Sequence, residues 1–116
     1  MSLPLEGIRV VDAAQIFAGP GAAMYLADQG AEVIKLEPPG GEGCRYLYTS
    51  DKAPFGKSFL VLNRNKRSIV VDLEHAGGRE VLHRLASWAD VFISSLLPDA
   101  AQRLEADYKS LSRINP

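Results

Sequence analysis

The chain has 116 residues, of which 47% are apolar and 23% are charged, and its formal net charge is −1. This composition is typical of one globular domain, and the near-neutral charge argues against a dedicated nucleic-acid binder. No apolar run is long enough to cross a bilayer. The single cysteine, Cys44, has no disulfide partner, and two distant histidines form no metal motif. We therefore expect a cytoplasmic protein that binds no nucleic acid, membrane or metal.

The first predicted elements form a βαβ unit between residues 8 and 37. An apolar run begins at Ile8 and ends at Asp12, and the cluster Gly19-Pro20-Gly21 opens a stretch of helix formers that stops at Gly30. A second β-branched run then ends at Glu37. Such a unit normally places a ligand at the carboxyl ends of its strands.

This unit departs from the dinucleotide-binding fingerprint. Six residues separate Asp12 from Gly19, and Met24 occupies the position of the third glycine. The loop is too long for the tight G-x-G-x-x-G turn, so a nicotinamide- or flavin-dependent oxidoreductase is disfavoured. The longer loop, from Ala13 to Ala18, can still bring backbone amides to an anion beside a helix N-terminus.

Residues 38–62 are predicted to form a long loop, because prolines, glycines and scattered aromatic residues interrupt every periodic pattern there. Two interpretations are equally favoured: a lid or wall of a ligand site, and a surface excursion held by its aromatic side chains. A basic turn from Asn63 to Arg67 then leads into a predicted strand from Ser68 to Leu73.

The last third of the chain predicts a helix, a strand and two short helical segments. Apolar residues between 81 and 88 recur at helical spacing, and Trp88 among them is expected in the core. A buried strand from Val91 to Ile93, a short helix from Pro98 to Arg103 and a last turn capped by Asp107 follow. The chain therefore predicts an α/β fold with a parallel sheet of about four strands, in the order 3-2-1-4, and helices on both faces.

Six motifs occur in a fixed order along this chain. They are Pro4 to Asp12, Ala18 to Pro20, Leu26 to Glu37, Pro39-Gly40, Asn63 to Ser68 with Asp72-Leu73, and Gly78 to Glu80 through Val91. In this order they resemble the N-terminal part of the family III CoA-transferases of the CaiB/BaiF type. That family includes carnitine CoA-transferase, formyl-CoA transferase and α-methylacyl-CoA racemase, and the resemblance extends from Pro4 to Pro116.

The resemblance implies that residues 1–116 are an N-terminal, Rossmann-like CoA-binding segment, an incomplete half of a larger fold whose two copies interlock as a homodimer. Members of the family move CoA between carboxylic acids through an acyl-aspartate anhydride, or epimerise the carbon next to an acyl-CoA thioester. The family's aspartate nucleophile falls beyond Pro116, so no catalytic residue is assigned within this chain, which is not expected to be catalytic alone. Coenzyme A or an acyl-CoA thioester is the expected substrate, without a metal.

Nine positions are candidates for contact with CoA. The resemblance to the family implies the first seven of them. In the family, the loop after the first strand contacts CoA largely through its backbone, the strand exit borders the adenine, and a basic residue lies near the phosphates. They are Ile16, Phe17 and Ala18 in the loop, Val71, Asp72 and Leu73 at the strand exit, and Arg103. Lys66 and Arg67 are phosphate neighbours by charge and placement, against the alternative of solvated turn charges.

Two departures from the family pattern bear on function. Pro38 stands where the family commonly has an arginine on the nucleotide, and Ser94 to Asp99 replaces the usual Glu-Asn-Phe-x-Pro-Gly. Three interpretations stay open: an enzyme segment of CoA-transferase or racemase type, a degenerate structural domain of the same ancestry, and an unrelated nucleotide-binding oxidoreductase. The order of the motifs favours the first two.

Overall fold

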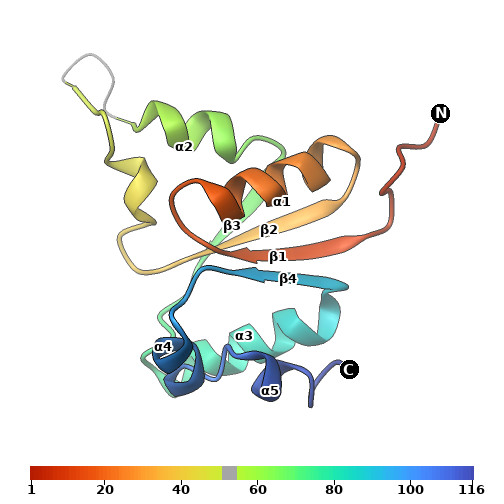
Figure 1. The fold of residues 1–116 in the computed structure, drawn as a ribbon, viewed down its shortest axis with the longest axis vertical. Coiled ribbons are helices and arrows are strands. Elements are labelled where there is room, and N and C mark those ends of the chain that lie inside the picture. Colours follow the sequence, from red (N-terminus) through yellow and green to blue (C-terminus); the bar gives the residue numbers. More distant parts are fainter. Residues whose placement is uncertain (51–54) are drawn as a thin grey trace.

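The structure is a computed structural model that describes residues 1–50 and 55–116 (Figure 1). Its four strands are β1 (Arg9–Ala13), β2 (Glu32–Glu37), β3 (Lys66–Val70) and β4 (Val91–Ser94). They form one parallel sheet in the order β3-β2-β1-β4, which confirms the predicted order. All four strands therefore end at the same edge of the sheet, the carboxyl edge.

Helices cover both faces of this sheet (Figure 1). On one side lie α1 (Ala18–Asp28) and α2 (Lys57–Leu62), and on the other side lie α3 (Ala76–Trp88), α4 (Pro98–Arg103) and α5 (Tyr108–Leu111). The predicted short helix from Pro98 to Arg103 is confirmed, and the Asp107 side chain caps α5 by accepting a hydrogen bond from the Ser110 amide. None of the helices in the described part of the chain is long and apolar enough to cross a membrane.

The two faces of the sheet differ in chemistry, because neighbouring residues of a strand point to opposite sides. On the face covered by α3, Val11, Leu36 and Val71 pack in an apolar cluster with the fully buried Leu82. We call this the apolar face. On the face covered by α1 and α2, Val10 and Val33 pack against alanines of α1 near the amino ends of the strands. Towards the carboxyl ends the same face carries the buried charged residues Asp12, Lys35 and Glu37. We call this the charged face. The buried side chain of Lys66 reaches Asp12 from the first position of β3.

The first helix stops where the sequence predicts. Gly30 has a φ of +102°, and a side chain there would place its Cβ 2.6 Å from the Cβ of Leu3. Only glycine adopts this conformation without strain and leaves room for the N-terminal segment. Trp88, predicted in the core, is partly buried against the apolar cluster, and the guanidinium of Arg9 lies 5.7 Å from its ring centre.

The predicted loop 38–62 is wrong in part, because it contains the 3-10 turn η1 (Gly43–Arg45) and helix α2. Phe59 is buried beneath the guanidinium of Arg45, whose carbon lies 3.8 Å from the ring centre, and this contact anchors α2 beside η1. The amide of Gly56 donates to the carbonyl of Arg45, and a Cβ at Gly56 would lie 2.0 Å from the carbonyl oxygen of Cys44. The glycines and aromatic residues taken as loop signals thus serve a close approach and a buried anchor, while part of the predicted loop, residues 51–54, lies outside the described residues.

Strand β3 begins two residues earlier and ends three residues earlier than the predicted strand from Ser68 to Leu73. Its first residue, Lys66, is paired in register with Val33 of β2, and the pairing ends at Val70 opposite Glu37. Val71 still donates to the Glu37 carbonyl, but the chain then turns at Asp72 towards α3.

Candidate functional site at the carboxyl edge of the sheet

The order of the strands defines one special place on the carboxyl edge. From β1 the chain proceeds through α1 to β2 on one side, while β4, reached through α3 on the opposite face, pairs with β1 on the other side. The loops that follow β1 and β4 therefore lead to opposite faces of the sheet from neighbouring strands. In Figure 1 the start of α1 and helix α4 lie at this edge. Parallel α/β sheets bind their ligands at such topological switch points.

The loop after β1, residues 14–17, is held by side chains from three different elements. The Gln15 amide donates to Ser95 Oγ at 3.0 Å, which joins the loop to the segment after β4. The Ala14 carbonyl accepts from Lys35 Nζ at 2.8 Å, and the Ile16 amide donates to Glu42 Oε2 at 2.9 Å. Side chains of the protein itself therefore fix this loop, as a preorganised binding loop requires.

The backbone of this loop is strained at Ile16, whose φ is +70°. A β-branched residue rarely adopts this left-handed conformation, and such residues concentrate at ligand clamps and active sites. The loop also approaches α1 closely, since a Cβ at Gly19 would lie 2.1 Å from the Cβ of Ala14. Helix α1 then begins at Ala18 with no side-chain cap on its N-cap residue, Phe17. Its first backbone amides are the groups that an anionic or carbonyl ligand can reach.

Beneath the loop, two lysines share one carboxylate on the charged face. The Nζ atom of Lys66 lies 2.8 Å from Asp12 Oδ2, and that of Lys35 lies 3.4 Å from the same oxygen. All three side chains are at most 1% exposed. Buried charges need such partners, because an isolated one would lose its hydration without compensation.

This geometry corrects the expectation for Lys66 as a phosphate neighbour. Its ammonium is buried and donates to Asp12, to the carbonyl of Pro20 and to the side chain of Asn63, each at 2.8 Å. All three of its protons are in use. Burial lowers the pKa of Lys66, and the hydrogen bond to Asp12 opposes that shift. Lys66 thus ties α1 and the end of α2 to the sheet, and its Nζ offers no free donor to a phosphate.

Arg67 does not reach the carboxyl edge either. It pairs in register with Ile34 near the amino ends of β2 and β3, and its exposed guanidinium pairs with Glu32. The charge of Arg67 does not reveal at which edge of the sheet the residue lies, because that depends on where strand β3 begins. The structure thus places Arg67 away from the loops that follow the strands.

Val71, Asp72 and Leu73 do leave the sheet at the carboxyl edge, as expected. Val71 is buried, while Asp72 accepts from the amide of Glu74 and caps the turn. Arg103 comes to the same turn from α4, where its exposed guanidinium pairs with Glu74. The structure therefore brings the strand exit and Arg103 together. Exposed ion pairs contribute little to the free energy of folding, so the Arg103 guanidinium can leave Glu74 at low cost and bind another anion.

Three residues that the sequence analysis missed meet near the end of β2, namely Glu37, Arg45 of η1 and Ser68 of β3. Glu37 accepts both guanidinium hydrogen bonds of Arg45 at 2.7 Å and the hydroxyl of Ser68 at 2.5 Å. Burial raises the pKa of Glu37, but these bonds and the amide of Glu42 outweigh it and lower the pKa to about 2. The sequence contained a signal for Glu37, because Val33, Lys35 and Glu37 are spaced two residues apart and therefore share one face of the strand.

The two departures from the family pattern have visible local roles. Ser95 accepts from the Gln15 amide, and Ser94 Oγ accepts from the Leu96 amide, so these serines shape the loops that follow β1 and β4. The Pro38 carbonyl accepts from the Gly41 amide in a tight turn. The cleft nearest to this turn has a volume of about 400 Å³ and includes Arg45, Tyr46 and Val70 in its lining.

A larger cleft, of about 760 Å³, lies elsewhere. It is lined by residues at the start of β4 and by α5, among them Phe92, Tyr108 and Asn115. None of the nine candidate residues lines it. Within residues 1–50 and 55–116, no group of three or more histidine, cysteine, aspartate or glutamate side chains is placed to hold a metal ion.

The fold defines an α/β protein with one parallel sheet, and the candidate site lies at the switch point of that sheet. The family model for CoA-transferase family III matches residues 5–116, and the chain belongs to that family. It is 39% identical over 97% of its length to succinyl-CoA:glutarate CoA-transferase of Mus musculus, and 40% identical over 97% to a probable fatty acyl-CoA transferase of Mycobacterium tuberculosis. It covers 26% and 29% of those proteins.

Solved structures agree with this assignment. A CaiB/BaiF family protein from Brucella suis aligns with the whole chain at a TM-score of 0.91 and 38% identity, and the alignment covers 32% of that protein. A Mycobacterium tuberculosis protein aligns over 99% of the chain at a TM-score of 0.90 and 40% identity, with 32% of its own length covered. The chain therefore corresponds to the N-terminal portion of a family III CoA-transferase and spans about three tenths of its relatives.

Proposed function

We propose that this chain is the CoA-binding segment of an enzyme that moves CoA between carboxylic acids. One observation carries the proposal. The loop after β1 lies at the switch point and is held there by Lys35, Ser95 and Glu42. Fixed backbone groups at the start of a helix suit the amides, carbonyls and phosphates of CoA, because they bind without first becoming ordered.

In this proposal CoA crosses the carboxyl edge. Ile16, Phe17 and Ala18 contact it through their backbone, and its adenine lies beside the strand exit from Val71 to Leu73. Arg103 leaves Glu74 to pair with a phosphate, which a guanidinium binds in a bidentate manner. Lys66 supports the loop from below and takes no part in binding phosphate.

The chemistry itself is assigned to residues outside this chain. An aspartate supplied beyond residue 116 attacks the thioester carbonyl and releases CoA as the thiolate, which leaves an acyl-aspartate anhydride. The acceptor carboxylate then attacks the aspartyl carbonyl carbon of this anhydride and displaces the donor acid as a carboxylate, which leaves an anhydride between the aspartate and the acceptor acid. The thiolate finally attacks the carbonyl carbon of the acceptor acid, which forms the new CoA thioester and releases the aspartate carboxylate. The names of the two relatives refer to succinyl-CoA and glutarate in one case and to fatty acyl-CoA in the other. An acyl-CoA and a free carboxylic acid are therefore the proposed substrates.

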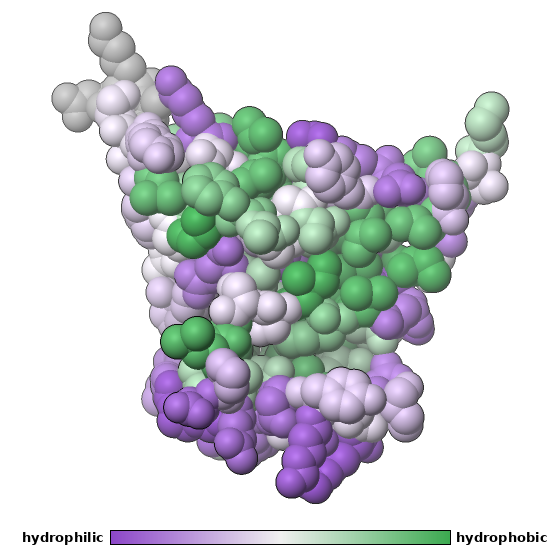
Figure 2. Space-filling model, in the orientation of Figure 1, coloured by the Kyte–Doolittle hydropathy of each residue, from purple (hydrophilic) through white to green (hydrophobic). Residues whose placement is uncertain are grey.

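We also propose that the intact protein is a homodimer in the cytoplasm. Large apolar side chains remain exposed on this chain, among them Tyr25 on α1 and Val91 at the start of β4. Figure 2 shows apolar surface over α1 and the neighbouring strands, whereas hydrophilic surface gathers towards α5. Apolar surface of this kind is normally covered by further chain or by a partner subunit.

A second candidate is a structural domain of the same ancestry that has lost CoA binding. Pro38 removes an arginine from the expected nucleotide contact, and the Ser94 to Asp99 segment lacks the family's amide and aromatic side chain. These losses favour weak binding or none. An acyl-CoA racemase of the same family is a third candidate, because it binds the same part of its substrate.

Titration of CoA into the intact protein by calorimetry separates a CoA-binding segment from a structural domain that has lost CoA binding. We expect binding that weakens with added salt, because the phosphates are held by charge. Arg103→Ala should weaken it about tenfold, and Pro38→Arg should strengthen it about tenfold. Arg84→Ala on the exposed surface of α3 is the matched control and should leave the affinity unchanged. Absence of binding at millimolar CoA would overturn the proposal in favour of the structural domain.

A further inference from the structure

Glu42 has an unusual environment for a carboxylate. Its side chain is fully buried, and its Oε2 accepts the Ile16 amide at 2.9 Å. Its Oε1 is also buried and has no hydrogen-bond partner among the described residues. A buried carboxylate loses hydration, so a single hydrogen bond to the side chain is poor compensation for keeping it there.

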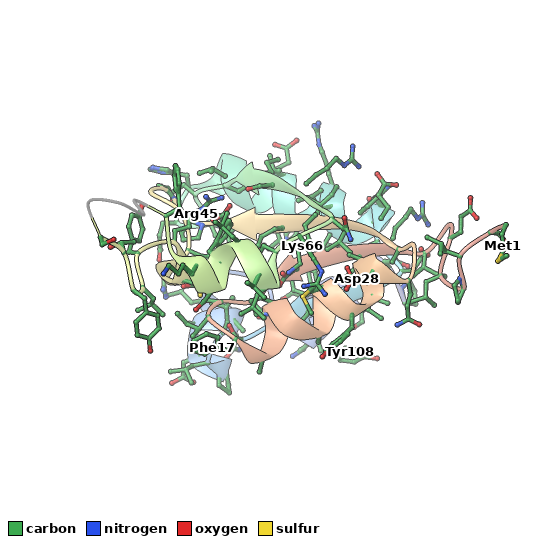
Figure 3. The ribbon with its side chains drawn as sticks, turned by 90° about the horizontal axis from the view of Figure 1, so that it is seen from above. Met1, Phe17, Asp28, Arg45, Lys66 and Tyr108 are labelled. Atoms are coloured by element: carbon green, nitrogen blue, oxygen red, sulfur yellow. The ribbon has the colours of Figure 1, made fainter. Side chains whose placement is uncertain are left out.

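The position of Glu42 is set by the ion pair at the end of β2. Its amide donates to Glu37 Oε1 at 3.0 Å, and its carbonyl accepts from the Arg45 amide at 3.1 Å. Figure 3 shows the Arg45 side chain over this end of the sheet, on the same face as Lys66. Glu42 is therefore attached at its backbone to the sheet and reaches with its side chain across to the loop after β1.

The residue that Glu42 holds is the strained one. Ile16 has a φ of +70°, which a β-branched residue adopts only when its surroundings impose it. The hydrogen bond from its amide to a buried carboxylate is charge-assisted and stronger than a neutral one. Since Ile16 directly precedes Phe17 and Ala18, its conformation determines where their backbone groups lie.

We propose that Glu42 is a positioning residue that holds Ile16 in its left-handed conformation and so sets the backbone of the CoA-binding loop. The consequence for CoA rests on the proposed function, whereas the effect on Ile16 does not. The ion pair between Glu37 and Arg45 acts one step further away, by holding Glu42. The hydrogen bond between Ile16 and Glu42 thus connects the end of β2 to the loop at the switch point, beside the bond from Lys35 to the Ala14 carbonyl.

Amide hydrogen exchange of Ile16, measured by NMR on the intact protein without ligand, tests the first step. Glu42→Ala should accelerate this exchange at least tenfold, because it removes the acceptor. Glu42→Gln retains a side-chain oxygen for the Ile16 amide and should leave the exchange within about threefold of the wild type. Glu80→Ala is the matched control, since Glu80 is an exposed glutamate of α3 that pairs with Arg84.

Calorimetric titration with CoA tests the second step. Glu42→Ala should raise the Kd about tenfold, Glu42→Gln less than threefold and Glu80→Ala not at all, while kcat at saturating substrate stays within twofold of the wild type. A merely structural role would lower the amount of folded protein without changing the Kd of the part that remains folded. This split between affinity and folded fraction distinguishes positioning from general stability.

The outcomes separate the two proposals. If wild-type protein does not bind CoA, the proposed function fails, and Ile16 exchange still decides whether Glu42 holds the loop. Unchanged Ile16 exchange in Glu42→Ala, or acceleration in Glu42→Gln equal to that in Glu42→Ala, would overturn the role of Glu42. If Glu42→Ala does not fold, the exchange of Ile16 in Glu42→Gln decides alone, because retained protection supports the hydrogen bond and lost protection contradicts it.

Discussion

The two faces of the sheet are built from the same strands and stabilised in opposite ways. On the apolar face Val11, Leu36 and Leu82 exclude water by packing alone. On the charged face Asp12 lies between two lysines, and each lysine also donates to a backbone carbonyl, of Ala14 or of Pro20. Apolar packing is non-directional, whereas hydrogen bonds fix particular groups. The charged face therefore determines where the loop after β1 lies, and the apolar face mainly determines whether the chain folds.

Removal of the shared carboxylate should have the largest effect. Asp12→Asn keeps the shape of the side chain but removes the carboxylate charge that both buried ammonium groups contact. We expect a loss of about 3–5 kcal/mol in the free energy of unfolding, measured by urea denaturation. A change below about 1 kcal/mol would mean that the cluster is hydrated in solution, and the comparison of the two faces would then break down.

A cavity on the apolar face should cost somewhat less and act differently. Leu82 is fully buried in α3, and Leu82→Ala should reduce the free energy of unfolding by about 2–5 kcal/mol. Under conditions where this variant is folded, its Kd for CoA should equal that of the wild type. A weakened affinity at full folding would show that the apolar face also positions the loop.

The sequence predicted the apolar face better than the charged face, for a physical reason. The strands appear as β-branched runs, and their order follows from the handedness of the crossovers, so both were accessible from local pattern. The partners on the charged face, by contrast, are far apart in sequence, with Asp12 on β1, Lys35 on β2 and Lys66 on β3. Only the register of three strands brings them together.

The residues of the candidate site divide in the same way into those that local sequence pattern predicts and those that depend on partners far apart in the sequence. Ile16 and Val71 follow strands β1 and β3 at the carboxyl edge, and Arg103 ends the helix that follows β4, so each lies beside an element whose presence the sequence pattern indicates. Lys66 was misjudged, because whether a lysine at a strand start points to solvent or under a helix depends on which face it occupies. Glu42 could not be found from the sequence at all, since its role depends on a bond to an amide 26 residues earlier.

Acid should act on the charged face through Glu37. Its pKa of about 2 in the folded protein lies below the usual 4.5, so the ionised form stabilises the fold. This contribution is complete above about pH 4.5 and is lost as the pH falls towards 2, and the shift corresponds to about 3 kcal/mol. Urea unfolding at pH 6, 4 and 3 should show the decline. In Glu37→Gln the decline over this range should be smaller, whereas an identical profile would assign the acid sensitivity to other groups.

An exposed ion pair should have the smallest effect and isolates the importance of burial. Glu80 and Arg84 form a pair at 2.7 Å on the surface of α3, at a shorter distance than either lysine has to Asp12, but both side chains are mostly exposed. Water and salt screen such a pair, and ordering two long side chains offsets its attraction. Arg84→Ala should therefore leave the urea midpoint within the scatter of repeat measurements, at low and at high salt. If it instead destabilised the protein as much as Asp12→Asn does, the charge of the pair rather than its burial would be the cause, and the contrast between the two faces would lose its physical basis.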